Sequence, residues 1–155
     1  MGIIRLVIAI LIAQAAGLIG SLFTTPQIPT WYADLNKPDF TPPGWVFGPV
    51  WTALYTLMGI ASLRIWQRRQ THGPARKALV LYGVHLFFNV LWSVLFFGMR
   101  NPGLALIEIV VLWGVILWLM GLFYRIDRYA AYLLVPYAVW VAFAAVLNFS
   151  IWRLN

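Results

Sequence analysis

Five long apolar stretches constrain the fold of this chain more than any other feature of its sequence. A helix that crosses a bilayer needs about 20 mostly apolar residues, and such stretches occupy residues 4–23, 44–66, 79–98, 103–124 and 129–152. They do not alternate between apolar and polar residues, as the strands of a membrane barrel do. Because backbone groups in hydrocarbon must bond within their own segment, we expect an all-α integral membrane protein. The prediction is one domain over residues 1–155, a bundle of five transmembrane helices with a long structured loop between the first two.

The distribution of charge predicts how the chain sits in its membrane. Only 10% of the residues are charged, and the net charge of +7 comes from basic residues between apolar spans, which argues against a nucleic-acid partner. With five spans, eight Lys/Arg fall on one side, namely Arg5, Arg64, Arg68, Arg69, Arg76, Lys77, Arg125 and Arg128. The other side holds Lys37, Arg100 and Arg153. In a plasma membrane, the positive-inside rule then places the N-terminus in the cytoplasm and the C-terminus outside. The basic side could also contact anionic lipid.

The first stretch has two interpretations. Arg5, an apolar run and "AQA" at residues 13–15 are also typical of a signal peptide, but the run continues to Phe23, which favours a spanning helix. Small residues recur every fourth position, at Ala9, Ala13, Gly17 and Ser21. Such a stripe allows a close helix contact, either inside the bundle or between two copies.

The segment "WYADLNKPDFTPPGWVFGPVW" at residues 31–51 holds six aromatic residues and four prolines. Residues before proline favour extended geometry, so we expect a stiff loop, with Thr41 as the N-cap of the next helix. One interpretation of Trp31 and Tyr32 is an aromatic belt at headgroup depth. A belt explains Trp51 less well, because Trp51 lies nearly two turns inside the second span.

Three helices carry stripes in which aromatic and amide residues share a face. The stripes are Trp51, Tyr55 and Ser62; His85, Asn89, Trp92, Ser93 and Phe96; and Trp140, Ala144, Asn148 and Trp152. Amides and hydroxyls in a membrane seek the bundle interior, so we expect these stripes to face one another. They could line a cavity suited to a large, flat, apolar ligand with a polar edge, or they could form a solid aromatic core. The sequence leaves both alternatives open.

Two titratable residues lie inside the predicted spans. Glu108 is either part of a proton relay or a neutral carboxyl bonded to a neighbouring helix, and the absence of a second acid in a span favours the latter. His85 is either a haem ligand or, as we favour, a hydrogen-bonded core histidine. The chain has no cysteine, and no metal-ligand spacing, phosphate loop or nucleophile–base pair is present. We therefore expect neither a metal nor a cofactor.

Three segments resemble one known family. They are residues 31–51, "FNVLWS" at 88–93 and "PYAVWVAFAAVLNFSIWRLN" at 136–155. They are similar to the tryptophan-rich sensory protein or translocator protein family, whose eukaryotic members were called peripheral benzodiazepine receptors. The resemblance implies a compact five-helix bundle, often a homodimer. It also implies a pocket beneath the first loop that binds porphyrins, notably protoporphyrin IX, and synthetic isoquinoline or benzodiazepine ligands.

The resemblance and the stripes together predict the ligand-binding residues. These are Trp31, Tyr32, Pro42, Trp45, Trp51, Tyr55, Asn89, Trp92, Ser93, Phe96, Ile109, Trp140, Ala144 and Asn148. A sterol or another lipid is a further partner in the family, but here Phe149 stands ahead of Arg153 where animal members carry a tyrosine. The missing phenol argues against a sterol site there.

Three functional hypotheses follow from the resemblance. The favoured one is a receptor or sensor that binds porphyrin and regulates tetrapyrrole levels or a stress response. The second is an enzyme that degrades protoporphyrin in light, with Trp51 and Trp140 as the redox-active catalytic residues. The third is a transporter of porphyrin or lipid, against which stand the lack of an ion-coupling pair and of inverted repeats.

Overall fold

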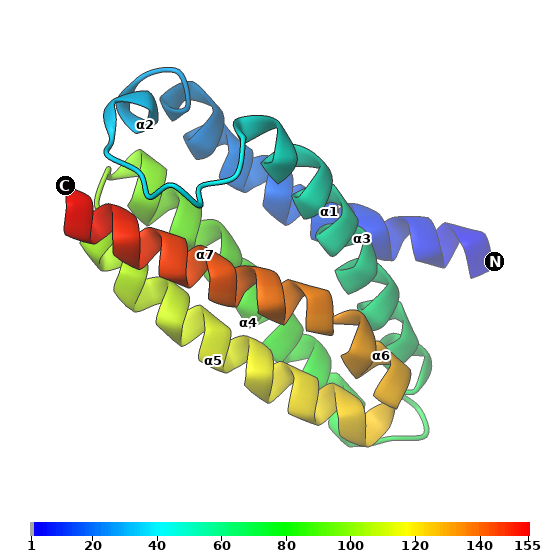
Figure 1. The fold of residues 1–155 in the computed structure, drawn as a ribbon. Helices are drawn as coiled ribbons and strands as arrows, with labels where there is room; N and C mark the ends of the chain where they lie inside the picture. The colour runs from blue at the N-terminus through cyan, green and yellow to red at the C-terminus, as the bar shows by residue number, and fades with distance from the viewer. Residues whose placement is uncertain (1) are drawn as a thin grey trace.

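The computed structural model describes residues 2–155 and confirms the predicted class, an all-helical chain with five helices long and apolar enough to cross a membrane (Figure 1). No strand occurs among residues 2–155. The elements are α1 (Gly2–Thr24), a 3₁₀ turn η1 (Thr25–Gln27), α2 (Trp31–Asp34), α3 (Gly44–Gln67), α4 (Pro74–Ser93), a π-helical turn η2 (Val94–Gly98), α5 (Pro102–Ile126), α6 (Arg128–Leu133) and α7 (Val135–Leu154).

Two of the predicted spans are not single α-helices. The third ends in the π-helical turn η2, where the N–H of Met99 donates to the carbonyl of Val94 at 2.7 Å. The fifth is divided into α6 and α7 at Leu134, two residues before Pro136, because proline cannot supply the N–H that a continuous helix needs there. The aromatic pattern gave no sign of either irregularity.

The start of α3 differs from the prediction. Thr41 does not cap the helix; its hydroxyl donates to the carbonyl of Pro38 at 2.7 Å, and the helix begins three residues later at Gly44. Two prolines separate Thr41 from the helix and hold the chain extended, so the Thr41 side chain closes a turn in the loop instead. Pro43 takes the N-cap position without any side-chain hydrogen bond.

The helices form a bundle in which each has preferred neighbours. α3 runs along α1, α4 packs between α1 and α5, and α5 packs along α7. α6 fills the corner between the ends of α3 and α5. α1 is therefore a packed member of the bundle.

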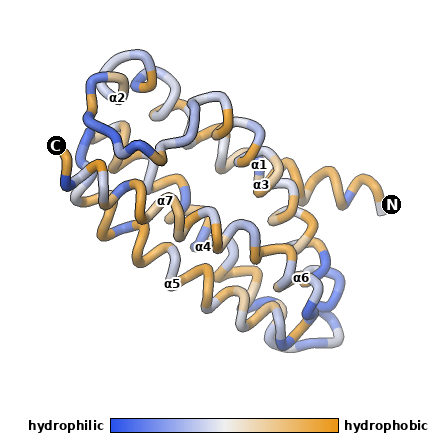
Figure 2. Tube along the Cα trace, in the orientation of Figure 1, coloured by the Kyte–Doolittle hydropathy of each residue, from blue (hydrophilic) through white to orange (hydrophobic). Residues whose placement is uncertain are grey.

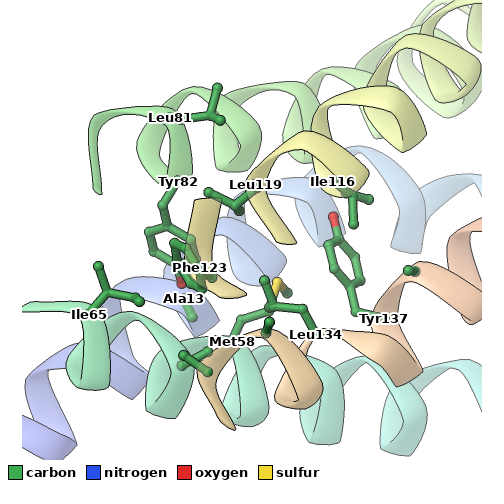
Figure 3. Packing of buried hydrophobic residues seen from close by; sticks show 14 of the residues in the cluster. Ala13, Met58, Ile65, Leu81, Tyr82, Ile116, Leu119, Phe123, Leu134 and Tyr137 are labelled. Carbon is green, nitrogen blue, oxygen red and sulfur yellow. The ribbon is translucent and has the colours of Figure 1, made fainter. Parts of the chain in front are cut away.

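The buried core lies between α3, α4, α5 and α7 in the half of the bundle near α6 (Figure 3). Met58, Tyr82, Phe123, Leu134 and Tyr137 all belong to this core, and the side chain of Tyr137 is 1% exposed. Large apolar side chains are exposed along the outside of the long helices, as a bilayer requires. Hydrophilic stretches gather at the two ends of the bundle (Figure 2).

Candidate functional site

The loop between α1 and α3 is fixed to the bundle by a small set of polar contacts. The ammonium of Lys37 donates to the carbonyls of Tyr32, Ala33 and Leu35 at 2.7, 3.2 and 2.9 Å, which satisfies the open end of α2. The Asn155 amide donates to the carbonyl of Asn36, and the Asn36 N–H donates back to Asn155 Oδ1 at 3.0 Å. The loop is thus held against the end of α7.

Within this loop, α2 rests on the aromatic residues of η2 at the end of α4. The Trp31 ring meets Phe96 edge-on at 5.7 Å between centroids, and the Tyr32 ring lies 5.6 Å from Phe97. Phe96 also stacks on Trp92 at 5.0 Å. Both phenylalanines are buried, and both lie in the π-helical turn η2. Turns of this type are common at functional sites.

An amide ties three helices together below that cluster. The indole N–H of Trp92 on α4 donates to Asn148 Oδ1 on α7 at 3.0 Å, and Asn148 Nδ2 donates to the carbonyl of Pro102 on α5 at 2.8 Å. Asn148 is 1% exposed, so both of these bonds form away from solvent. The prediction that amides find partners inside the bundle is confirmed here.

α3 and α7 face each other through aromatic rings. Trp51 of α3 stacks on Tyr55 at 5.4 Å and meets Tyr137 of α7 edge-on at 6.2 Å. Nearer the loop, Phe47 of α3 meets Trp140 of α7 at 5.9 Å. Trp51 and Trp140 are each half-buried. We call this contact, with Phe47, Trp51, Tyr137 and Trp140 as its members, the ring contact.

A buried hydrogen-bond chain crosses the floor of the ring contact. The Tyr55 hydroxyl donates to Asn89 Oδ1, Asn89 Nδ2 donates to the Tyr137 hydroxyl at 3.0 Å, and the Tyr137 oxygen lies 3.1 Å from His85 Nε2. His85 Nδ1 lies 2.9 Å from the carbonyl of Tyr82. The carbonyl can only accept, so Nδ1 carries the proton and Nε2 accepts from Tyr137. Both ring nitrogens are used, which fits the favoured interpretation of a hydrogen-bonded core histidine.

Some predicted site residues lie elsewhere. Trp45 is 77% exposed and takes no part in these ring clusters, because it lies on the outer face of the first turn of α3. Ser93 faces α1, since a Cβ added at Gly20 would lie 3.1 Å from its hydroxyl. Ile109 is buried in the core at 3% exposure. Pro42 and Ala144 are partly buried, and Ala144 packs at the edge of the core.

Glu108 corrects an expectation. Its side chain is buried, with 6% exposure, yet neither carboxyl oxygen has a hydrogen-bond partner among residues 2–155. The predicted bond to a neighbouring helix is therefore absent from the described part of the chain. A polar group buried without a partner destabilises the fold.

The sequence interpretation missed several ring residues, namely Phe47, Phe97, Tyr137 and Phe143. Tyr137 and Phe143 each stand three residues from Trp140, a spacing that places them near the same helical face. That spacing was a usable signal. No sequence signal pointed to Phe97. It is adjacent to Phe96, and both side chains are buried where the chain forms the π-helical turn.

The opposite end of the bundle is basic. Asp127 caps α6 and pairs with Arg64 of α3 at 2.9 Å. Burial alone would raise the pKa of Asp127, but hydrogen bonds from Arg64 and from the N–H groups of Ala130 and Tyr129 hold that pKa below its ordinary value. Within residues 2–155 no group of His, Asp and Glu side chains has the arrangement of a metal site.

These features define a class of protein, a multi-pass helical membrane protein whose aromatic interior lies beneath a fixed loop. Comparison with known proteins then gives the family. The model of the TspO/MBR family matches residues 9–153, and the chain belongs to that family.

Named relatives cover most of the chain. The tryptophan-rich protein TspO of Archaeoglobus fulgidus is 43% identical over 155 residues, covering 100% of this chain and 99% of its own. The tryptophan-rich sensory protein of Cereibacter sphaeroides is 42% identical, over 81% of this chain and 77% of its own length. The human translocator protein is 39% identical, over 88% of this chain and 82% of its own length. Membership supports a role as a membrane sensor or translocator.

Proposed function

We propose that this protein is a membrane receptor or sensor that binds porphyrins such as protoporphyrin IX between α3 and α7, beneath the 25–43 loop. The observation that carries the proposal is the ring contact itself. The Trp51 ring meets that of Tyr137 at 6.2 Å and the Phe47 ring meets that of Trp140 at 5.9 Å between centroids, so the contact is made by side chains. Because rings that meet edge-on through side chains alone can turn aside without moving a helix, a flat apolar ligand can enter this contact and stack on them.

The surroundings of the ring contact support the same class of ligand. Asn89 and Tyr55 supply polar groups at its floor, and the loop above carries Phe40, whose ring lies 6.3 Å from Phe143 of α7. Isoquinoline and benzodiazepine compounds share the flat, apolar character of a porphyrin and are proposed to bind at the same place. We propose that the basic end faces the cytoplasm, so the loop and the ring contact lie toward the outside.

Tryptophan fluorescence tests the proposal directly. Trp51 and Trp140 would lie against a bound porphyrin, so addition of protoporphyrin IX to the purified protein should quench their emission at micromolar ligand. Trp118 of α5 is 62% exposed on the outside of the bundle and serves as a matched control. Trp118→Phe should leave the ligand-dependent quenching nearly intact, and Trp51→Phe should reduce it. Absence of quenching at micromolar ligand would refute porphyrin binding.

A second candidate function is light-dependent degradation of the bound porphyrin. The observation that favours it is the series of contacts from Trp51 to Tyr55 and Tyr137, because indole and phenol rings can exchange electrons with an excited porphyrin. Under illumination in air, the wild-type protein should convert protoporphyrin to products, and Trp51→Phe and Trp140→Phe should abolish that conversion. Unchanged product formation in both variants would remove these tryptophans from the reaction.

A further inference from the structure

A groove lies between α3 and α6, at the basic end of the bundle and away from the ring contact. Its volume is about 590 Å³, and its lining residues are Ile60, Arg64, Tyr129, Tyr132 and Leu133. The two helices lie side by side there (Figure 1). None of these residues belongs to the predicted porphyrin site, so the groove needs an explanation of its own.

One part of the groove is positively charged. The Arg64 guanidinium lies 5.4 Å from the Tyr129 ring, and the Arg128 guanidinium lies 5.0 Å from the same ring. Arg128 also donates to the Tyr129 hydroxyl at 3.2 Å. Asp127 pairs with Arg64 and balances one of the two charges. This part of the groove therefore keeps a net positive charge, and the Tyr129 hydroxyl can still donate its hydrogen. Donors of this kind suit a phosphate.

The rest of the groove is apolar. Ile60 stands four residues from Arg64 on α3, so it lies one turn, about 5 Å, toward the middle of the membrane. Leu133 flanks it from the end of α6. The groove thus changes from charged to apolar along the membrane normal. A lipid changes in the same direction from headgroup to acyl chain.

Charge also decides which occupant fits. The chain has four acidic side chains, of which Asp34 and Asp39 lie in the loop at the other end of the bundle, Glu108 is buried, and Asp127 is already paired. A second copy in the same orientation would bring Lys and Arg to this level of the membrane and no free acid. Anionic lipid headgroups are the anions that a membrane supplies at this depth.

We propose that this groove is a binding site for an anionic phospholipid of the adjoining leaflet. The phosphate accepts hydrogen bonds from the neighbouring Arg128 guanidinium and Tyr129 hydroxyl, with Arg64 behind them, and one acyl chain follows Ile60 and Leu133. The site is separate from the ring contact, so it goes beyond the proposed porphyrin function.

Lipid titration of the purified protein in a zwitterionic detergent tests the site. Native mass spectrometry should show that phosphatidylglycerol is retained more strongly than phosphatidylcholine of the same chain length. About 0.5 M salt in a parallel thermal-shift titration screens diffuse attraction beyond a few ångströms and leaves direct contacts. Arg128→Gln should weaken phosphatidylglycerol binding about ten-fold, because it removes charge-assisted hydrogen bonds.

A matched variant separates a site from a generally basic surface. Arg125 is exposed at the same end and is not among the residues that line the groove, whereas Arg128 bonds to the lining residue Tyr129. Arg125→Gln removes the same charge. That variant should change binding by less than about two-fold under screening salt. Equal losses in Arg125→Gln and Arg128→Gln would overturn the proposal in favour of diffuse attraction.

Two further results complete the test. Ile60→Trp keeps every charge but fills the apolar part of the groove, so it should also weaken phosphatidylglycerol binding; unchanged binding would refute the acyl-chain placement. Inorganic phosphate should produce no thermal shift and should not compete with the lipid. Competition by phosphate would show a free-anion site, and equal retention of the two lipids would show no site for an anionic headgroup.

Discussion

α3 meets α1 and α7 in two different ways. Against α1 the contact is backbone to backbone: a Cβ added at Gly59 would lie 2.6 Å from the Cα of Ile10 and 2.9 Å from the carbonyl oxygen of Ala9. A Cβ at Gly17 would collide with the Tyr55 ring. Against α7 the contact is made by the rings of Phe47, Trp51, Tyr137 and Trp140.

The two sides of α3 therefore differ in how easily their contacts can rearrange. Backbone atoms cannot move aside without displacing a whole helix, so the α1–α3 contact is a fixed framework. Side-chain rings can change rotamer while their helices stay in place. A ligand can therefore enter the ring contact at a lower cost than it could enter the α1–α3 contact, and substitutions on the two sides of α3 should separate stability from binding.

The largest effect is expected on the framework side. Gly59→Leu should destabilise the fold by about 3 kcal/mol, because the new side chain meets the backbone of α1 and cannot be accommodated by rotamer changes. The measurement is reversible unfolding in detergent, followed by circular dichroism. Gly114 of α5 has nothing within 4 Å of an added Cβ, and Gly114→Leu is the control, with little or no loss expected. If both variants behave alike, the contrast between the two contacts is wrong.

On the ring side, Ala144→Thr should affect binding more than folding. Ala144 stands one turn beyond Trp140 on a partly buried face of α7, and a branched polar group there should crowd a large ligand. We expect protoporphyrin affinity to fall by about 1–2 kcal/mol, roughly ten-fold. Fluorescence titration measures the affinity and thermal unfolding the stability. Unaltered affinity would show that this face of α7 does not line the ligand site.

Glu108→Leu probes the helix behind the ring contact. The carboxyl is buried without a partner, so replacing it by an apolar residue of similar size should stabilise the fold by about 1–2 kcal/mol. Thermal unfolding in detergent, with Glu108→Gln as the isosteric comparison, measures the change. A loss of porphyrin affinity in Glu108→Leu with retained affinity in Glu108→Gln would instead show that a ligand uses this side chain.

The smallest effect is expected at the end of α3 that lies far from the loop. Asp127→Asn keeps an N-cap for α6 but removes the ion pair with Arg64, and should cost about 1 kcal/mol near neutral pH. Because the folded state lowers the pKa of Asp127, its contribution is present above about pH 4 and is lost as the pH falls through the lowered folded value. The stability difference between variant and wild type should therefore shrink in acid. A difference that stays constant from pH 7 to pH 3 would contradict this assignment.

The sequence indicated the ring contact only in part. The spacing of Trp51 with Tyr55, and of Trp140 with Ala144 and Asn148, follows directly from the helical repeat. The repeat could not show that Trp45 lies outside the ring clusters or that Ser93 faces α1, because both depend on how one helix is rotated against another. Glu108 illustrates the same limit. The sequence predicted that its carboxyl lies inside a span, but it could not predict that the carboxyl lacks a hydrogen-bond partner.

The sequence by itself determined that the protein lies in a membrane and which segments form its helices. Runs of about 20 apolar residues predict spanning helices, and the basic residues marked one end of the bundle. The tertiary structure alone decided which helices touch, how the 96–97 pair is buried through a π-helical turn, and where the last span breaks. Those features depend on contacts between residues far apart in the chain, and hydrophobic periodicity records only which residues share a face of one helix.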